Sequence, residues 1–558
     1  MFNGNTLRDA IISAANNLTN NRKAVDDLNV FPVPDGDTGT NMSMTLSNSV
    51  RELEKLEGAT AGKVAAVNAS ALLRGARGNS GVITSLLFRG FAKGIGEEEY
   101  LTAENLTAAL KLGVEGAYKA VMKPTEGTIL TVARVASEKA QEALTNGADV
   151  LGVFDEALKG AKEALEQTPE LLPTLKKAGV VDAGGRGFVL ILEGMQSVLR
   201  DGIIVKNEIV NTSSEPEENE NRNAAGEFDG EITFTYCTEF IVNRDPECAK
   251  EPQELRAYLE SIGDCVVVVD DEEIIKVHVH TDHPGNAIEN GLTFGGLVHL
   301  KIENMRDQHE RAKHDAEEAA KKPTKSADLT ETIEPVEITK SVGFVSVCAG
   351  DGLAELFRDL GVDMVVSGGQ TMNPSTDDIL RAVEKCPAST VFVLPNNKNI
   401  IMAAEQTVPI STRKVIVIHT RTIPQGITAM LNFNDEADDE TNAIEMQKAA
   451  EKIATGQVTF AARDSDFDGH KIKEGEIMAL TGGKIAFTDS DVERATLKLI
   501  NKMVKRSSEF VTVIYGKDIT DVAAEDLEKQ LNEKYGDKLE ITLVNGGQPV
   551  YYYIISVE

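Results

Sequence analysis

Two charged, weakly hydrophobic stretches divide this chain, and they constrain its fold more than any other feature. Residues 212–228 are polar and acidic, and residues 309–338 are charged and rich in Ala and Lys. Segments of this composition bury too little apolar surface to fold, so both are predicted to be linkers. The chain has 558 residues and a hydrophobic fraction of 41%, which predicts three or four domains with cores of their own.

The hydrophobic periodicity differs between the three parts. The first part has apolar stripes at helical spacing: Leu7, Ile11, Ala14 and Leu18, and Val153, Ala157, Ala161 and Leu165. The second has strand patterns at Ile232–Ile241, Val266–Asp270 and Ile274–His280. In the third, short apolar strands at Val342–Cys348, Met364–Ser367, Thr390–Leu394 and Lys414–His419 alternate with helices, which implies parallel strands.

We therefore expect a multidomain protein. Its parts are an all-α N-terminal domain (1–205), an acidic linker (206–228), a small α+β middle domain (229–310), a second linker (311–338) and an α/β C-terminal domain (339–558).

Charge and residue usage exclude several classes of protein. The net charge of −32 argues against a general nucleic-acid-binding role, because phosphate-rich partners need a basic surface. Neither a signal peptide nor an apolar run of transmembrane length is recognisable, and five sparse cysteines fit a cytoplasmic protein with reduced thiols. All cysteines and histidines follow residue 236, so chemistry in the first third must use carboxylates, hydroxyls, amides and backbone.

The most informative segment is the loop Asn29–Asn41. Asp35 and Asp37 are two residues apart, so an extended loop can turn both carboxylates toward one point. Magnesium is usually held by one or two carboxylates together with substrate phosphates. The following Thr-Gly-Thr-Asn leads into a helix, whose N-terminus favours phosphate. The alternative is a turn with a helix cap, which uses the same residue types.

A second loop, Arg77–Gly81, precedes an apolar helix that begins at Val82. Asn79, Ser80 and the backbone N–H groups could hold phosphates, or Ser80 could simply cap the helix. The known lysine-containing and glycine-rich nucleotide motifs are not found. A phosphate site built from aspartates and small polar loops would need a metal ion to neutralise charge.

Taken together, these loops resemble the ATP-binding domain of dihydroxyacetone kinases, and the whole chain resembles the catalytic component of fatty acid kinases. The motifs that carry the resemblance are Val33–Met42, Gly78–Gly81, Pro124–Leu130 and Val181–Gly187. It implies an N-terminal kinase domain folded as an α-helical barrel, with ATP and two Mg²⁺ ions at one open end.

The resemblance also implies roles for individual residues. Asp35 and Asp37 would bind the two magnesium ions and carry the catalysis, and Asn29 is the nearest match to a third family ligand, with one extra residue of spacing. The residues that would contact phosphates are Thr38, Gly39, Thr40, Asn41, Asn79 and Ser80. Those that would line the nucleoside are Thr128, Ile129, Asp182 and Gly184.

Two departures from dihydroxyacetone kinases concern the substrate. Many of those enzymes carry His where this chain has Thr38, and they have a separate substrate domain with a covalent histidine, which this chain lacks. Both departures favour the carboxylate of a fatty acid as the phosphoryl acceptor, presented by a separate fatty-acid-binding protein. A kinase of a small polyol and a non-enzymatic lipid-binding scaffold are the alternatives.

The middle domain contains a candidate zinc site. His278 and His280 are two apart in a strand pattern, so they share a face, and Cys237 lies in the preceding strand. One Cys and two His suit zinc, with Asp282 or His283 as a possible further ligand. On spacing alone, two surface histidines and an unrelated cysteine explain the pattern better; the family resemblance favours the metal.

The C-terminal part resembles the fold of fatty-acid-binding proteins of the same system. Its loops Ser367–Thr376 and Thr420–Ile427 could hold a carboxylate or could be plain strand-to-helix turns. We expect a role in partner docking or in forming a homodimer.

Overall fold

The computed structural model describes residues 1–29, 36–121, 124–207, 234–244, 248, 250, 252–270, 274–304, 336–369, 372–467 and 470–558; within the middle domain and at 465–471, some side chains are excluded. The chain divides into two compact units. One comprises Met1–Ser214 together with Ile333–Glu558, and the other comprises Glu215–Thr332. The linker predictions fall almost wholly outside the described residues.

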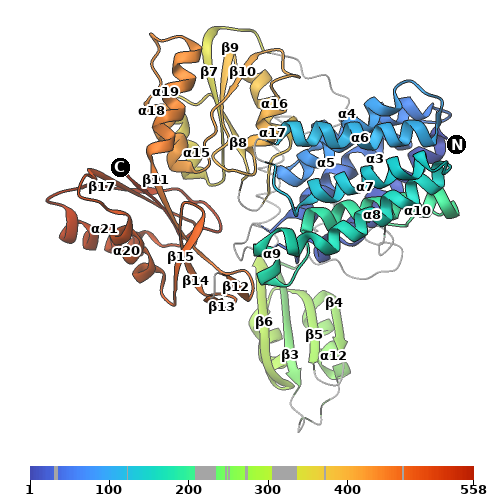
Figure 1. Ribbon diagram of the computed structural model, residues 1–558. Helices are drawn as coiled ribbons and strands as arrows, with labels where there is room; N and C mark the ends of the chain where they lie inside the picture. The colour runs from blue at the N-terminus through green and yellow to red at the C-terminus, as the bar shows by residue number, and fades with distance from the viewer. Residues whose placement is uncertain are drawn as a thin grey trace. The chain divides into compact units, whose positions relative to one another are not determined.

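The N-terminal part is helical, as predicted. Its helices are α1 (Gly4–Asn20), α2 (Arg22–Asp26), α3 (Thr38–Glu54), α4 (Ala61–Gly75), α5 (Gly78–Ile95), α6 (Ala103–Ala120), α7 (Ile129–Thr145), α8 (Val150–Leu171), α9 (Pro173–Ala178) and α10 (Ala183–Asp201). Both predicted apolar stripes are buried, on α1 and α8. Neighbour contacts run from α3 through α4, α5, α6, α7 and α8 to α10, and α10 packs on α1, which returns to α3 (Figure 1).

Helices α5 and α6 approach each other through small residues. A Cβ atom added at Gly94 would lie 2.3 Å from the backbone of Ala109, and one at Gly90 would lie 2.4 Å from Gly113. Only glycine permits this backbone-to-backbone approach, which brings the two helices together along one seam.

Among its described residues, the middle domain has a four-stranded antiparallel sheet of order β4-β5-β3-β6 and two helices. Its elements are β3 (Tyr236–Arg244), α12 (Pro252–Ile262), β4 (Gly263–Asp270), β5 (Ile274–Thr281), α13 (Pro284–Leu292) and β6 (Gly295–Asn304). The core between sheet and helices includes Phe240, Leu255, Leu259, Val277 and Phe294. The helices and strands of this domain have the α+β arrangement that the sequence predicts.

The C-terminal part begins with a parallel sheet of order β10-β9-β7-β8, as the alternation of strands and helices predicts. The elements are β7 (Lys340–Cys348), α15 (Asp351–Asp359), β8 (Met364–Ser367), α16 (Thr376–Lys385), β9 (Ala388–Leu394), α17 (Ile401–Glu405), β10 (Lys414–Val417), α18 (Ile423–Leu431) and α19 (Asp439–Lys452). Helices α15, α18 and α19 cover one face and α16 and α17 cover the other (Figure 1).

A second sheet follows, and the sequence did not predict it. It has six strands in the order β15-β14-β11-β18-β16-β17, and all neighbours are antiparallel except β16 and β17. The elements of this sheet and its helices are β11 (Ala454–Phe460), β14 (Ile477–Thr481), β15 (Lys484–Asp489), α20 (Val492–Met503), β16 (Phe510–Tyr515), α21 (Asp521–Tyr535), β17 (Glu540–Asn545) and β18 (Tyr553–Val557). Strands β12 (Ser465–Phe467) and β13 (His470–Ile472) form a separate antiparallel pair.

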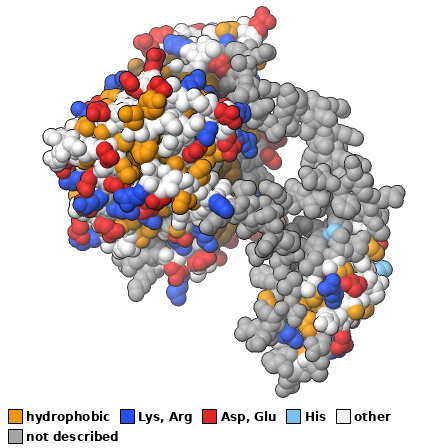
Figure 2. All heavy atoms as spheres, turned by 90° about the vertical axis from the view of Figure 1, so that its right-hand side faces the viewer, with side chains coloured by type: hydrophobic (Ala, Val, Ile, Leu, Met, Phe, Trp, Pro, Cys, Tyr) orange, Lys and Arg blue, Asp and Glu red, His pale blue; other side chains and the backbone are white. Residues whose placement is uncertain are grey.

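The helical part and the C-terminal part share a continuous core within their unit. Helix α16 contacts α4, and α17 contacts α5. Buried residues of α16 and α17, such as Ile379 and Ala403, belong to the same apolar cluster as the N-terminal helices. On the face shown in Figure 2, acidic, basic and hydrophobic side chains are interspersed. No helix among the described residues is both long and apolar enough to cross a bilayer.

Candidate kinase site

The start of α3 carries the second aspartate of the predicted pair. Asp37 is the N-cap residue of α3, but its side chain makes no capping hydrogen bond. Its Oδ2 instead accepts a hydrogen bond of 2.7 Å from Nδ2 of Asn373, in the C-terminal domain. Asp35 lies outside the described residues, so the predicted convergence of the two carboxylates stays a prediction.

Asp26 caps α3 in place of Asp37, and the sequence reasoning missed it. Its Oδ1 accepts hydrogen bonds from the backbone N–H groups of Gly39 (2.6 Å) and Thr40 (3.1 Å), and its Oδ2 accepts one from the Thr40 hydroxyl (2.8 Å). A carboxylate at a helix N-terminus stabilises the exposed N–H groups and the helix dipole. In this structure the donors predicted for phosphate at Gly39 and Thr40 therefore already serve Asp26.

Asn29 lies beside the same helix start. Its Oδ1 accepts a hydrogen bond of 2.8 Å from the Thr38 hydroxyl, and its Nδ2 donates to the carbonyl of Asp26 (2.9 Å). Asn29 therefore links the end of α2 to the start of α3 through both ends of its amide. Its carbonyl oxygen keeps a second lone pair, so the arrangement is compatible with the predicted metal ligand.

The second predicted loop lies against the first. Gly78 begins α5 with a positive φ of 56°, and a Cβ atom there would lie 2.6 Å from Nδ2 of Asn41 on α3. The backbone N–H of Arg77 donates to the hydroxyl of Thr45, also on α3 (3.2 Å). The helix starts of α3 and α5 therefore meet, as the aspartate loop and the Gly-Asn-Ser turn must do in one phosphate site.

The helix-capping alternative for Ser80 is wrong. The N-cap residue of α5 is Arg77, and it makes no side-chain capping hydrogen bond. The Ser80 carbonyl accepts from the Thr84 hydroxyl (2.8 Å), as an ordinary position inside the helix does. Asn79 donates to Oδ1 of Asn399 at 3.4 Å, while its own Oδ1 is buried and has no hydrogen-bond partner among the described residues.

The predicted nucleoside loops also lie together. A Cβ atom at Gly184 would lie 3.2 Å from Cβ of Ile129, which begins α7. Asp182 is the N-cap of α10 and accepts a 2.7 Å hydrogen bond from the backbone N–H of Gly185. Burial raises the pKa of Asp182 to about 6, against the opposing effect of backbone hydrogen bonds from Gly185 and Ile129. One carboxylate thus ties the starts of α7 and α10. Thr128 is the N-cap residue of α7 and makes no side-chain capping hydrogen bond.

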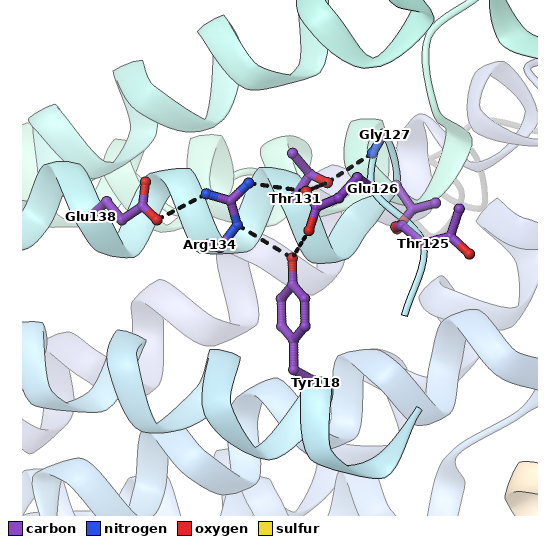
Figure 3. Close-up of polar contacts among 8 residues, drawn as sticks. Tyr118, Thr125, Glu126, Gly127, Thr131, Arg134 and Glu138 are labelled. Carbon is purple, nitrogen blue, oxygen red and sulfur yellow. Dashed lines mark hydrogen bonds and ion pairs between the residues drawn. The ribbon is translucent and has the colours of Figure 1, made fainter. Parts of the chain in front are cut away.

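A polar cluster fixes the approach to α7 (Figure 3). Glu126 accepts hydrogen bonds from the hydroxyls of Thr131 (2.7 Å) and Tyr118 (3.0 Å) and pairs with Arg134 (3.0 Å). The hydrogen bond from Thr131 is the main cause that lowers the pKa of Glu126, with Arg134 and Tyr118 adding to it. The Thr131 hydroxyl also accepts from the backbone N–H of Gly127 (2.8 Å). The cluster therefore holds the loop that precedes Thr128 and Ile129.

In the middle domain, the strand register places the predicted zinc ligands at neighbouring positions of the sheet. Cys237 on β3 pairs with His280 on β5, and His278 lies two residues along the same strand. These three positions share a face of the sheet, because paired residues and alternate residues of strands do so. The side chains of Cys237 and His278 lie outside the described set, and the side chains that are described form no metal-binding group of three. The Asp282 carboxylate accepts from the backbone N–H of Thr235 (2.8 Å).

The C-terminal domain has a small cavity at the carboxyl ends of its parallel strands. Cys348, Gly369 and the buried amides of Asn396 and Gln548 are among its lining residues. Its volume is about 10 Å³, room for no more than one water molecule. This end of an α/β sheet is the usual place for a ligand, but the cavity found here is small.

Comparison with known proteins now identifies the family. Three family profiles match: the DAK2 domain over residues 32–197, the FakA-like middle domain of fatty acid kinases over 233–312, and the FakA-like C-terminal domain of fatty acid kinases over 343–558. Protein YloV of Bacillus subtilis (strain 168) is 41% identical over 561 residues, covering 100% of this chain and 99% of that protein. This chain belongs to the FakA-like fatty acid kinase family. A protein of Staphylococcus epidermidis (strain ATCC 12228 / FDA PCI 1200) is 40% identical to this FakA-like chain over 559 residues, covering 100% of this chain and 99% of that protein.

Two solved structures match parts of this FakA-like chain. A dihydroxyacetone kinase from C. freundii, in complex with AMP-PNP and Mg²⁺, covers 34% of this chain and 33% of its own, with 18% identity and a TM-score of 0.27. A fatty-acid-binding DegV family protein from Thermus thermophilus covers 39% of this chain and 99% of its own, with 15% identity and a TM-score of 0.28.

Two residues of this FakA-like chain escaped the sequence reasoning, Asp26 and Asn373. The acidic Asp26 is followed by another acid, Asp27, and neither has a motif that marks it as a cap. Asn373 lies 336 residues from its partner Asp37. The Asn-Pro-Ser-Thr turn at 373–376 was noted, but a sequence pattern cannot say which distant loop it meets.

Proposed function

We propose that this protein transfers the γ-phosphoryl group of ATP to the carboxylate of a fatty acid that a separate fatty-acid-binding protein presents. The product is an acyl phosphate. The observation that carries the proposal is the meeting of the α3 and α5 starts at Asp37, Asn41 and Gly78, in a chain of the FakA-like fatty acid kinase family.

In the proposed site, Asp35 and Asp37 hold two Mg²⁺ ions, with Asn29 at the edge. Carboxylate and amide oxygens are the hard ligands that magnesium prefers, so the residues fit the ion. The bound ions neutralise the triphosphate and the charge that develops on the transferred group. The chain would position the phosphates through Asn41, Asn79 and Ser80, and through Thr38, Gly39 and Thr40 once their donors are released from Asn29 and Asp26. It would position the nucleoside through Thr128, Ile129, Asp182 and Gly184.

The acceptor follows from the available side chains. A fatty acid carboxylate is already ionised at neutral pH, so its phosphorylation needs no general base. A polyol hydroxyl would need one, and Thr38 stands where many dihydroxyacetone kinases carry His. An acyl phosphate is therefore the product that this set of residues supports best.

The small cavity at the carboxyl ends of the C-terminal parallel strands is not the binding site of the acid, which is compatible with a separate carrier. A space of about 10 Å³ cannot accept an acyl chain.

The middle domain is proposed to hold zinc through Cys237, His278 and His280, because the strand register puts the three positions on one face. A homodimer through the C-terminal domain stays a prediction.

The test is turnover of ATP by the full-length protein with Mg²⁺, a fatty-acid-binding protein and its bound acid. We expect Asp37→Ala and Asp35→Ala to lower turnover by at least about 100-fold, since removing one charge-stabilising group costs about that much. Asp27→Ala is the matched control, because its exposed carboxylate is close in sequence and its described contact uses the backbone carbonyl. Full turnover in both active-site variants would place the site elsewhere.

Two further arms separate the alternatives. Dihydroxyacetone offered in place of the fatty acid tests the polyol kinase. Calorimetry with ATP, with and without Mg²⁺, tests the scaffold: a scaffold has no magnesium-dependent ATP affinity.

A further inference from the structure

A short segment of the C-terminal domain, residues 373–378, lies directly on the start of α5. We name it the docking segment. The backbone N–H of Thr376 donates to the carbonyl of Ala76 (3.1 Å), and Ser375 forms an antiparallel bridge with Arg77. The docking segment therefore pairs with residues 76–77 as a strand would, through the main chain and independently of side-chain identity.

Arg77 adds a side-chain clamp. Its guanidinium donates to the carbonyl of Asn373 (2.8 Å) and lies 3.5 Å from the carboxylate of Asp378. The Asp378 side chain is 46% exposed, so this ion pair is screened by solvent and holds the segment only weakly. The contact of the docking segment with residues 76–77 is thus specific in geometry and built from polar groups, whereas the apolar packing of α16 on the N-terminal helices begins at Ile379, after the segment.

The tip of the docking segment reaches the proposed metal site. Asn373 is 3% exposed, and its Nδ2 donates to Oδ2 of Asp37 at 2.7 Å. The same Nδ2 would lie 3.3 Å from a Cβ atom at Gly78, so the amide lies between the start of α3 and the start of α5. The neutral amide of Asn373 thereby stabilises the carboxylate of Asp37, which on the proposed function would bind Mg²⁺.

The phosphoryl acceptor needs that space. In-line transfer requires the attacking oxygen to lie about 3–3.5 Å from the phosphorus, and the phosphate is held by ions on Asp37. A protein that brings the acid must place it there. In the described structure the docking segment lies against that carboxylate.

We propose that the docking segment is a removable cover of the kinase site, and that the surface it occupies, residues 76–78 with Asp37, is the docking surface for the acyl-carrying protein. This inference rests on the proposed function. The carrier would pair an extended segment with residues 76–77 and present its acyl carboxylate toward Asp37. Because the cover and the carrier compete for one surface, the apparent affinity for the carrier equals its intrinsic affinity multiplied by the fraction of molecules in which the cover is open.

A disulfide staple tests the cover. Residues opposite each other in an antiparallel bridge have Cα atoms about 4.5–5.5 Å apart, within the disulfide range of about 4.4–6.8 Å. Full-length protein with Arg77→Cys and Ser375→Cys is oxidised with glutathione disulfide, and the bond is verified by mass spectrometry. We expect the oxidised protein to lose carrier-dependent turnover at least tenfold and Mg²⁺-dependent ATP affinity several-fold. Dithiothreitol restores both to the level of the unoxidised double variant.

Each single-cysteine variant is oxidised and reduced in the same way, as a control for disulfides that involve the native thiols. An oxidised, stapled protein that turns over as fast as its reduced form overturns the cover, because Asn373 is then a working part of the site. Failure of the disulfide to form also overturns it, since the docking segment would not rest on Arg77 in solution.

Asn373→Ala gives a second measurement without engineered thiols. Removing the cover's tip should raise Mg²⁺-dependent ATP affinity several-fold, whereas a residue that positions Asp37 for its ion would lower it. Met372→Ala, at the exposed preceding position, is the control. The ATP measurement needs no fatty acid. If nucleotide binds but no acid is phosphorylated, the proposed function fails alone; if binding and turnover ignore the staple, the cover fails alone.

Discussion

At the residue scale, Asp182 shows how one partly buried carboxylate can set the pH dependence of a domain. Burial at the starts of α7 and α10 raises its pKa to about 6, whereas in an unfolded chain an aspartate titrates near 3.9. Between these values the folded protein binds more protons than the unfolded chain does. The free energy of unfolding therefore falls as the pH rises from about 4 to about 6, and the loss is complete above that range.

Asp182→Asn should remove this pH dependence while it keeps an oxygen that can cap α10. Two pKa units correspond to roughly 3 kcal/mol as an upper bound, at 1.36 kcal/mol per unit. We expect the thermal midpoint of the variant minus that of the wild type to increase from pH 4 to pH 6.5 and then to stay constant. Parallel curves over this range would show that Asp182 ionises normally in the folded protein.

Residue identity predicted which groups gather at the site better than it predicted how they bond. Gly78 lies against Asn41, and Gly184 lies against Ile129, so the members of each predicted pair of loops are neighbours. Asp26 was missed because its hydrogen bonds to Gly39 and Thr40 span 13 and 14 residues, and such a cap has no fixed spacing.

At the scale of elements, the seam between α5 and α6 depends on missing side chains. A Cβ atom at Gly94 would lie 2.3 Å from the backbone of Ala109, so Gly94→Ala must move one helix. Forcing extra volume into a packed contact costs about 1–3 kcal/mol. We expect a lower midpoint of unfolding in urea or heat.

Gly116→Ala, on α6, is the matched control. A Cβ atom there would meet only the carbonyl oxygen of Leu86, at 3.9 Å. Alanine is favoured over glycine inside a helix by up to about 1 kcal/mol, so this variant should be unchanged or more stable. Equal effects of the two substitutions would mean that the seam yields without strain.

The elements themselves were predicted where their pattern is local. The stripes on α1 and α8 and the apolar runs of β7 to β10 each lie within one element, and all were found. The second C-terminal sheet was missed because its central strands β11 and β18 pair across nearly 100 residues, and β14 and β16 join them from elsewhere in the chain. No periodicity within one strand reveals such a partner.

At the scale of the whole molecule, the zinc prediction concerns the middle domain. We expect one zinc per chain in the purified protein by elemental analysis, lost in Cys237→Ser and in His278→Ala, and lost on acidification as the ligands take up protons. Cys248→Ser is the control from the same domain, because the Cys248 thiol bonds the carbonyl of Thr293 at 3.5 Å. Metal-free wild type, or full zinc in Cys237→Ser, would contradict the prediction.

The capping of α3 by Asp26 has a consequence for how nucleotide can enter. A protein with a net charge of −32 already places an anion on the N–H groups that would otherwise bind a phosphate. Cations from solution must then balance the negative charge of the bound triphosphate. On the proposed function, ATP therefore enters the site already complexed with Mg²⁺. Uncomplexed ATP would bind too weakly to compete, and the rate would follow the concentration of the complexed nucleotide alone.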